Sequence, residues 1–147
     1  MATEMKTNKS AFFIGGTEIV LPDNQVKEIQ DIKSGDEVIT FSTDTERYMI
    51  GTVGNVSESE TNSLIRLVFD DETSITTTDE QSFFVEGKEW VMAKELVLGD
   101  SCIRFSSTPV TLTEIIPTID ENTMVYNLLD VVENDTFFAN GILVHNK

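Results

Sequence analysis

The chain has 147 residues, 39% of them hydrophobic, which is enough for one globular domain with a buried core. Its 26 acidic and 10 basic residues give a formal charge of −16, which disfavours nucleic acid and anionic membranes as partners because both repel such a surface. A single cysteine, Cys102, and a single histidine, His145, exclude an internal disulfide and disfavour a zinc site, so we expect neither metal nor cofactor.

Turn signals separate short runs of β-prone residues along almost the whole chain. Residues 1–10 precede these runs and lack apolar periodicity, so we expect a flexible leader or flanking segment there. Strands are predicted on either side of the Gly15-Gly16 turn within 11–21, and then at 26–32 (ending in a short helical turn), 37–41, 48–56, 64–69, 73–78, 83–85, 90–92, 101–105, 110–119, 125–132 and 136–144. Turns are predicted at 22–24, 33–36, 42–47, 57–62, 70–71, 134–135 and 140–141. Such strands without a long helical pattern predict an all-β fold.

One segment of the sequence is repeated in outline. Residues 26–41 and 90–105 share an apolar pair, a polar gap, an Asp/Glu-Ile/Leu pair, a Gly-Asp pair and a strand that ends in Phe. This repeat predicts two related halves around a pseudo-two-fold axis, with the first and last strands together in the centre. The alternative is one common β-turn used twice.

The end of the chain carries the residues with the clearest chemistry. The side-chain amide of Asn146 can attack its own main-chain carbonyl, close a five-membered succinimide ring and expel the amine of Lys147. The neighbouring imidazole of His145 can donate a proton to that amine. A His-Asn pair alone is weak evidence, because most such pairs are ordinary surface residues.

The order of several motifs resembles the Hint domain family of inteins and hedgehog-type autoprocessing proteins, above all minimal inteins and bacterial intein-like domains. The resemblance covers roughly residues 11–146, which we expect to be the domain, with Lys147 as the first downstream flanking residue. The matching motifs are Gly16-Thr17, Ile29 to Val38, Thr78 to Val85, Trp90 to Asp100, and Val125 to Asn146. The resemblance implies a horseshoe-shaped all-β fold, with Asn146 as the cyclising residue, His145 as its assistant and Thr78 as a hydrogen-bonding partner of the upstream scissile peptide.

The chain departs from the family pattern at the upstream junction, where a Cys or Ser nucleophile belongs. Ala11 is the first choice for that position; counting back from Gly16-Thr17 leads to Phe12, and Ser10 is a third candidate. Neither Ala nor Phe can perform an acyl shift, so we expect no upstream cleavage.

Other departures affect proton transfer and splicing. Gln81 stands where the family places a His, and a Gln can form hydrogen bonds but cannot deliver a proton at neutral pH. Asp135 stands where a second His is common and would orient an amide or accept a proton. Lys147 cannot accept a transferred chain, so cleavage is expected rather than splicing.

Two hypotheses follow for the function. The first is a single-turnover self-processing domain, a monomer whose only partners are its own flanking segments, which cuts after Asn146. The second is an inert β module that keeps the fold for a structural or binding role. Cys102 and Trp90 are expected to be core residues. The sequence leaves open whether the host protein is cytoplasmic or secreted.

Overall fold

The computed structural model describes residues 11–145, with residues 120–121 as main chain only. Its strands are β1 (Phe13–Ile14), β2 (Glu18–Leu21), β3 (Gln25–Glu28), β4 (Glu37–Ser42), β5 (Arg47–Thr52), β6 (Asn55–Phe69), β7 (Ser74–Thr77), β8 (Ser82–Val85), β9 (Glu89–Met92), β10 (Ser101–Ile103), β11 (Pro109–Leu129), β12 (Thr136–Ala139) and β13 (Ile142–His145). The helical elements in this range are the short 3-10 turns η2 (Pro22–Asn24), η3 (Ile29–Asp31) and η4 (Ala93–Glu95). The predicted all-β class is confirmed. None of the helices within the described range is long and apolar enough to cross a membrane.

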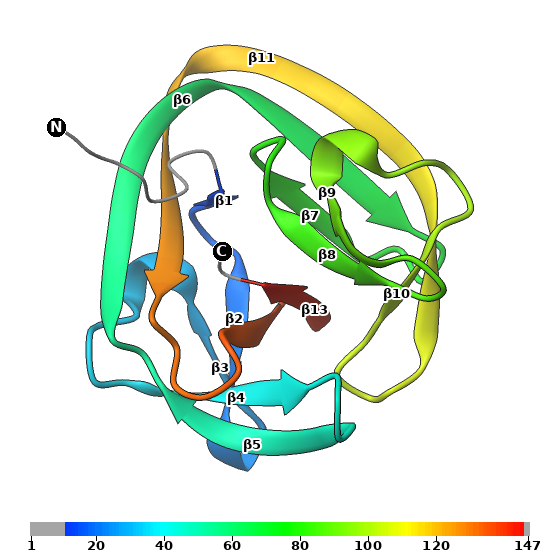
Figure 1. Ribbon diagram of the computed structural model, residues 1–147. Coiled ribbons are helices and arrows are strands. Elements are labelled where there is room, and N and C mark those ends of the chain that lie inside the picture. Colours follow the sequence, from blue (N-terminus) through cyan, green and yellow to red (C-terminus); the bar gives the residue numbers. More distant parts are fainter. Residues whose placement is uncertain (1–10, 146–147) are drawn as a thin grey trace, which may run out of the picture.

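The strands form one strongly bent sheet and a separate hairpin. The order in the sheet is β1-β7-β6-β11-β10-β8-β13-β12-β2-β3, with β9 beside β8 and a second contact between β1 and β11. The hairpin consists of β4 and β5. Figure 1 shows β6 and β11 curving together around the outer edge, whereas β1 and β13 lie in the interior. The sheet therefore brings the first and last described strands into the centre of the molecule, as predicted.

Two outer strands are much longer than predicted. The predicted turn at 57–62 lies inside β6, and β11 continues from the predicted strand at 110–119 into the run that begins at 125. The prediction of a turn at 57–62 was wrong. This part of β6 is mostly exposed on both faces, so its residues are polar without apolar alternation and do not show the usual pattern of a strand. Pairing between β6 and β11 supplies the main-chain hydrogen bonds, with irregularities near Glu114 and between Ile119 and Thr123.

The sequence repeat forms the same local structure twice. Gly35 and Gly99 have φ of 94° and 95°, a conformation that suits glycine, and each follows a 3-10 turn. Each next residue, Asp36 or Asp100, accepts a hydrogen bond from the main-chain N–H three residues earlier, at 2.9 and 3.0 Å. The two segments therefore share their turn geometry and hydrogen bonds, which agrees with the expected pseudo-two-fold repeat.

The central strands are buried on both faces. All of β12 is buried, and so are the first three residues of β13. This explains why Phe137-Phe138-Ala139 and Ile142-Leu143-Val144 are continuous apolar runs without alternation. The ring of Phe137 packs edge-on against Phe13 of β1, with centroids 5.9 Å apart. The core therefore fixes the position of the chain just before His145.

We expect Asp100→Asn to lower the free energy of unfolding at neutral pH and to change it little in acid. Burial raises the pKa of Asp100, but the hydrogen bonds from Lys88 Nζ (2.8 Å) and Val97 N–H (3.0 Å) outweigh it, so the pKa lies below its ordinary value. A carboxyl whose pKa is lower in the folded than in the unfolded chain stabilises the fold at pH values above its unfolded-state pKa. This stabilisation is lost as the pH falls through its folded-state pKa. Urea unfolding should show a loss of about 1–2 kcal/mol at pH 7 and a much smaller one near pH 3.

The repeat provides the control for this experiment. Asp36→Asn should follow the same pH dependence with a smaller loss, because the side chain of Asp36 is 30% exposed and that of Asp100 only 6%. Equal losses at pH 3 and pH 7 would contradict an electrostatic origin and would point to packing instead.

Candidate functional site

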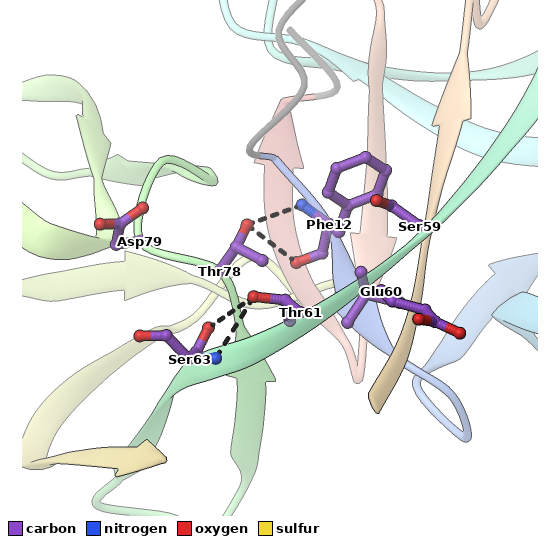
Figure 2. Close-up of a pocket in the computed structure, with 8 residues that line it drawn as sticks. Phe12, Ser59, Glu60, Thr61, Ser63, Thr78 and Asp79 are labelled. Carbon is purple, nitrogen blue, oxygen red and sulfur yellow. Dashed lines mark hydrogen bonds between the residues drawn. The ribbon is translucent and has the colours of Figure 1, made fainter. Parts of the chain in front are cut away.

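The turn at residues 78–81, between β7 and β8, holds the main chain just before β1. Phe12 N–H donates to Thr78 Oγ1 at 2.9 Å, and Thr78 N–H donates to the Phe12 carbonyl at 3.0 Å. The hydroxyl of Thr77, at the end of β7, donates to the same carbonyl at 2.7 Å. Figure 2 shows the Thr78 side chain directed at the main chain of Phe12. Both polar main-chain groups of Phe12 are therefore bound, and the peptide that joins it to Ala11 is held through its nitrogen.

The two candidates for the nucleophile position are both buried. Ala11 is 0% exposed and Phe12 6% exposed, and the Phe12 ring packs with Leu64 and Val125 in a small apolar cluster. Thr78 binds the main chain of Phe12. Ser10 lies outside the described residues.

A polar pocket opens beside the Phe12 main chain. It has a volume of about 160 Å³, and Figure 2 shows two of its lining residues, Glu60 and Asp79, on different sides of Thr78. Its lining residues are Phe12, Ser59, Glu60, Thr61, Ser63, Thr78, Asp79 and Val125. The hydroxyl of Thr61 accepts from the N–H of Ser63 at 3.3 Å, which ties the pocket wall together. Acidic and hydroxyl-bearing residues therefore line a pocket next to the upstream end of the domain.

At its other end the 78–81 turn contacts the last described strand. Gln81 is completely buried, and its Nε2 donates to the main-chain carbonyl of His145 at 2.6 Å and to that of Ser82 at 3.2 Å. That His145 carbonyl belongs to the peptide that leads to Asn146. The amide of Gln81 therefore contacts the downstream end of the domain and not the Phe12 main chain.

His145 ends β13 between two other strands and beside an aromatic ring. Its main chain pairs with Ser82 of β8 and Thr136 of β12. Its ring lies against the indole of Trp90, with centroids 4.9 Å apart and planes at 68°. Asn146, the predicted cyclising residue, lies outside the described residues, but the strand that delivers it is fixed on both sides.

A second pocket lies at the imidazole of His145. It has a volume of about 250 Å³. Its lining residues are Phe41, Ser42, Thr43, Asp44, Trp90, Asn134, Thr136 and His145. Asp135 immediately precedes Thr136, the pairing partner of His145, and is half-buried with its own N–H bonded to the carbonyl of Val131 at 3.0 Å. Asp135 therefore lies immediately before β12, the strand that pairs with β13 at His145.

Sequence reasoning overlooked two residues at this site. Trp90 was expected in the core, but it is only half-buried: it packs on the half-buried Phe84 at the edge of a small apolar cluster, and its ring also lies against that of His145. Thr77 was not singled out, although its hydroxyl binds the Phe12 carbonyl. The signal for Thr77 was the run of three threonines at 76–78, which strand propensity alone would also explain.

Cys102 is buried in the core, as expected, and takes no part in the site. Burial, helped by the nearby charge of Asp100, raises the pKa of its thiol to about 12. The thiolate, which is the reactive form, is therefore nearly absent at neutral pH. Among residues 11–145 no cluster of three or more His, Cys, Asp or Glu side chains is arranged to hold a metal ion.

Comparison with known proteins gives consistent results. Residues 19–147 match the family model described as the pretoxin HINT domain. The bacterial intein-like domain from Clostridium thermocellum has a similar structure, with a TM-score of 0.86, 29% identity, and coverage of 92% of this chain and 98% of that one. The DnaB intein from Synechocystis sp. PCC 6803 superposes with a TM-score of 0.82 at 22% identity, over 94% and 99% of the two chains.

The curated proteins contain no match to this chain. The structural similarity spans nearly the whole of both intein-like chains, and the family model covers the sequence from residue 19, within β2, to residue 147. The expected horseshoe-shaped Hint fold is therefore confirmed, and the chain belongs to the pretoxin Hint domain family of intein-like autoprocessing domains.

Proposed function

We propose that this domain cuts its own chain between Asn146 and Lys147 and that its upstream junction is inactive. The carboxamide nitrogen of Asn146 attacks the Asn146 main-chain carbonyl carbon, a succinimide closes, and the bond to the Lys147 nitrogen breaks. The proton lost from the carboxamide is balanced by the proton that His145 delivers to the departing amine. The reaction occurs once per molecule and uses no cofactor.

The observation that carries this proposal is the double attachment of the turn at residues 78–81. Thr78 binds the main chain of Phe12, and Gln81 binds the carbonyl of His145. These contacts join residues 66 and 64 positions apart in the sequence. A domain that acts on both of its own ends needs the two ends at one place, and this turn supplies that place.

For the upstream junction we propose that Phe12 occupies the position of the missing nucleophile. Thr78 binds the N–H of Phe12, which is the nitrogen of the Ala11–Phe12 peptide. The spacing to Gly16-Thr17 supports the same assignment. A phenyl ring has no lone pair for attack on the Ala11 carbonyl, so this junction stays intact.

The substrates of the proposed reaction are the flanking segments of the same chain. With Phe12 at the nucleophile position, we propose residues 12–146 as the processing domain, residues 1–11 as its upstream flank and Lys147 as the first residue released. The polar pocket beside Phe12 would receive the upstream flank, and the pocket beside His145 the downstream one. Asp135 would orient the downstream peptide from the turn before Thr136. The formal charge of −16 supports a monomer that binds neither nucleic acid nor membranes.

A reporter fused after Lys147 tests the proposal. On incubation, intact-mass analysis should show loss of everything after Asn146, and a domain product lighter by one water than its hydrolysed form, because it ends in a succinimide. Deamidation of Asn146 would instead add about one dalton without cutting the chain. An intact fusion after several days would overturn the proposal and support the inert module.

A further inference from the structure

The hydroxyl of Thr136, the first residue of β12, binds the main chain of a strand in the other sheet. Its Oγ1 accepts from the Phe41 N–H at 2.9 Å and donates to the Phe41 carbonyl at 2.8 Å. Phe41 lies in β4, which pairs with β5 in a separate two-stranded sheet, so one edge of β4 has no partner strand within residues 11–145. Because a hydroxyl can donate one hydrogen bond and accept two, Thr136 takes the place of a neighbouring strand at Phe41.

The same arrangement occurs at the upstream end of the domain. There Thr78 Oγ1 accepts from the Phe12 N–H at 2.9 Å and donates to the Phe12 carbonyl at 3.4 Å, as the dashed lines in Figure 2 show. Thr78 and Thr136 are both buried. Each end of the domain therefore has a threonine hydroxyl that holds both polar main-chain groups of one phenylalanine.

Thr136 is also the cross-strand neighbour of His145. The two residues lie directly opposite each other in the antiparallel pair of β12 and β13. Side chains of such a pair project from the same face of the sheet, with Cβ atoms about 4.5–5.5 Å apart. Both residues line the pocket of about 250 Å³, together with Phe41. The hydroxyl of Thr136 therefore joins the strand beside His145 to another wall of the same pocket.

We propose that Thr136 is a positioning residue for the downstream cleavage: its hydroxyl holds Phe41, and with it the wall of the pocket in which His145 delivers its proton. This inference rests on the proposed function. Thr136 exchanges no proton with the reacting chain, so the bonds and protons balance as they do there. A proton donor is effective only within hydrogen-bonding reach and in the right orientation, and a fixed wall limits the orientations of the imidazole.

Two substitutions at Thr136 test the role of the hydroxyl. Thr136→Val keeps the volume but leaves the N–H and the carbonyl of Phe41 without this partner, and it should slow release after Asn146 by about 10- to 100-fold, the effect of a small misplacement. Thr136→Ser keeps the hydroxyl and loses only a methyl group, so it should restore release to nearly the unsubstituted rate. Slow release from Thr136→Ser, equal to that from Thr136→Val, would overturn the role of the hydroxyl.

Thr17→Val is the matched control for lost stability. Thr17 is also buried, and its hydroxyl donates to the Ile14 carbonyl at 2.7 Å, but it does not line the pocket at His145. With both variants assayed well below their unfolding temperatures, Thr17→Val should change the release rate less than about two-fold. Equal slowing by Thr17→Val and Thr136→Val would overturn the inference, because general loosening of the fold would then explain both.

Measurements that need no cleavage separate this inference from the proposed function. In Asn146→Ala fusions, hydrogen exchange of the Phe41 N–H should be slow with Thr136 or Thr136→Ser and fast with Thr136→Val. Diethylpyrocarbonate should modify His145, the only histidine, faster in Thr136→Val and at an unchanged rate in Thr17→Val. These changes in a domain that never releases its reporter would support the positioning contact and overturn the proposed cleavage. Release that Thr136→Val leaves unchanged would overturn the inference and support the cleavage.

Discussion

Replacing Asn146 with alanine should abolish release of the segment after it, with the rate falling by at least about 1,000-fold. Alanine has no carboxamide, and no other group can close a five-membered ring on that carbonyl. Without the ring, cleavage would need a water molecule to attack an ordinary peptide bond, and this loses the large effective concentration of an intramolecular nucleophile. The measurement is intact mass of the reporter fusion, sampled over several days at pH 7.

His145→Ala provides the graded control. His145 contributes a proton rather than the nucleophile, so its loss should slow release by about 100-fold or more and leave the succinimide product unchanged. The ring contact with Trp90 is lost in the same variant, so circular dichroism should confirm that β13 is still folded. Continued cutting after residue 146 in Asn146→Ala would show that the bond breaks by another route and would contradict the mechanism.

Phe12→Cys should restore thiol-dependent cleavage of the Ala11–Phe12 peptide. Its sulfur would sit on the residue whose main chain is held by Thr78, one residue after the Ala11 carbonyl that it must attack. The N→S acyl shift moves the Ala11 acyl group from the residue-12 nitrogen to the cysteine sulfur, and an added thiol then releases the upstream segment as its thioester. With Gln81 directed at His145, no His assists this step, so we expect slow cleavage over hours with dithiothreitol. The readout is the mass of the shortened domain beginning at residue 12.

The controls for Phe12→Cys address packing and register. Phe12 packs with Leu64 and Val125, so its truncation should cost about 3–5 kcal/mol; Phe12→Ala makes a similar cavity without a thiol and should show no cleavage. Ala11→Cys should remain intact, because the Ser10–Ala11 peptide is one residue away from the main chain that Thr78 binds. Cleavage in Ala11→Cys but not in Phe12→Cys would assign the nucleophile position to Ala11 instead.

Local patterns predicted most of the strands. The Gly35-Asp36 and Gly99-Asp100 turns depend on positive φ at the glycine and on short-range hydrogen bonds, and both are encoded within a few residues. The continuous apolar runs of β12 and β13 likewise follow from burial on both faces. The stretch at 57–62 misled prediction because serine and asparagine favour turns and glutamate is uncommon in strands, whereas here a long partner strand supplies the main-chain hydrogen bonds.

The β class, the repeat and a His-Asn pair after an apolar strand can all be read from the amino-acid sequence. Which groups meet depends on the folded chain: Thr78 contacts the main chain of Phe12, Gln81 the carbonyl of His145, and Trp90 the ring of His145. These contacts join residues more than fifty positions apart, so they depend on the register and curvature of the whole sheet. The residues around Gln81 in the sequence therefore do not reveal that its amide donates to the carbonyl of His145, at the downstream end of the domain.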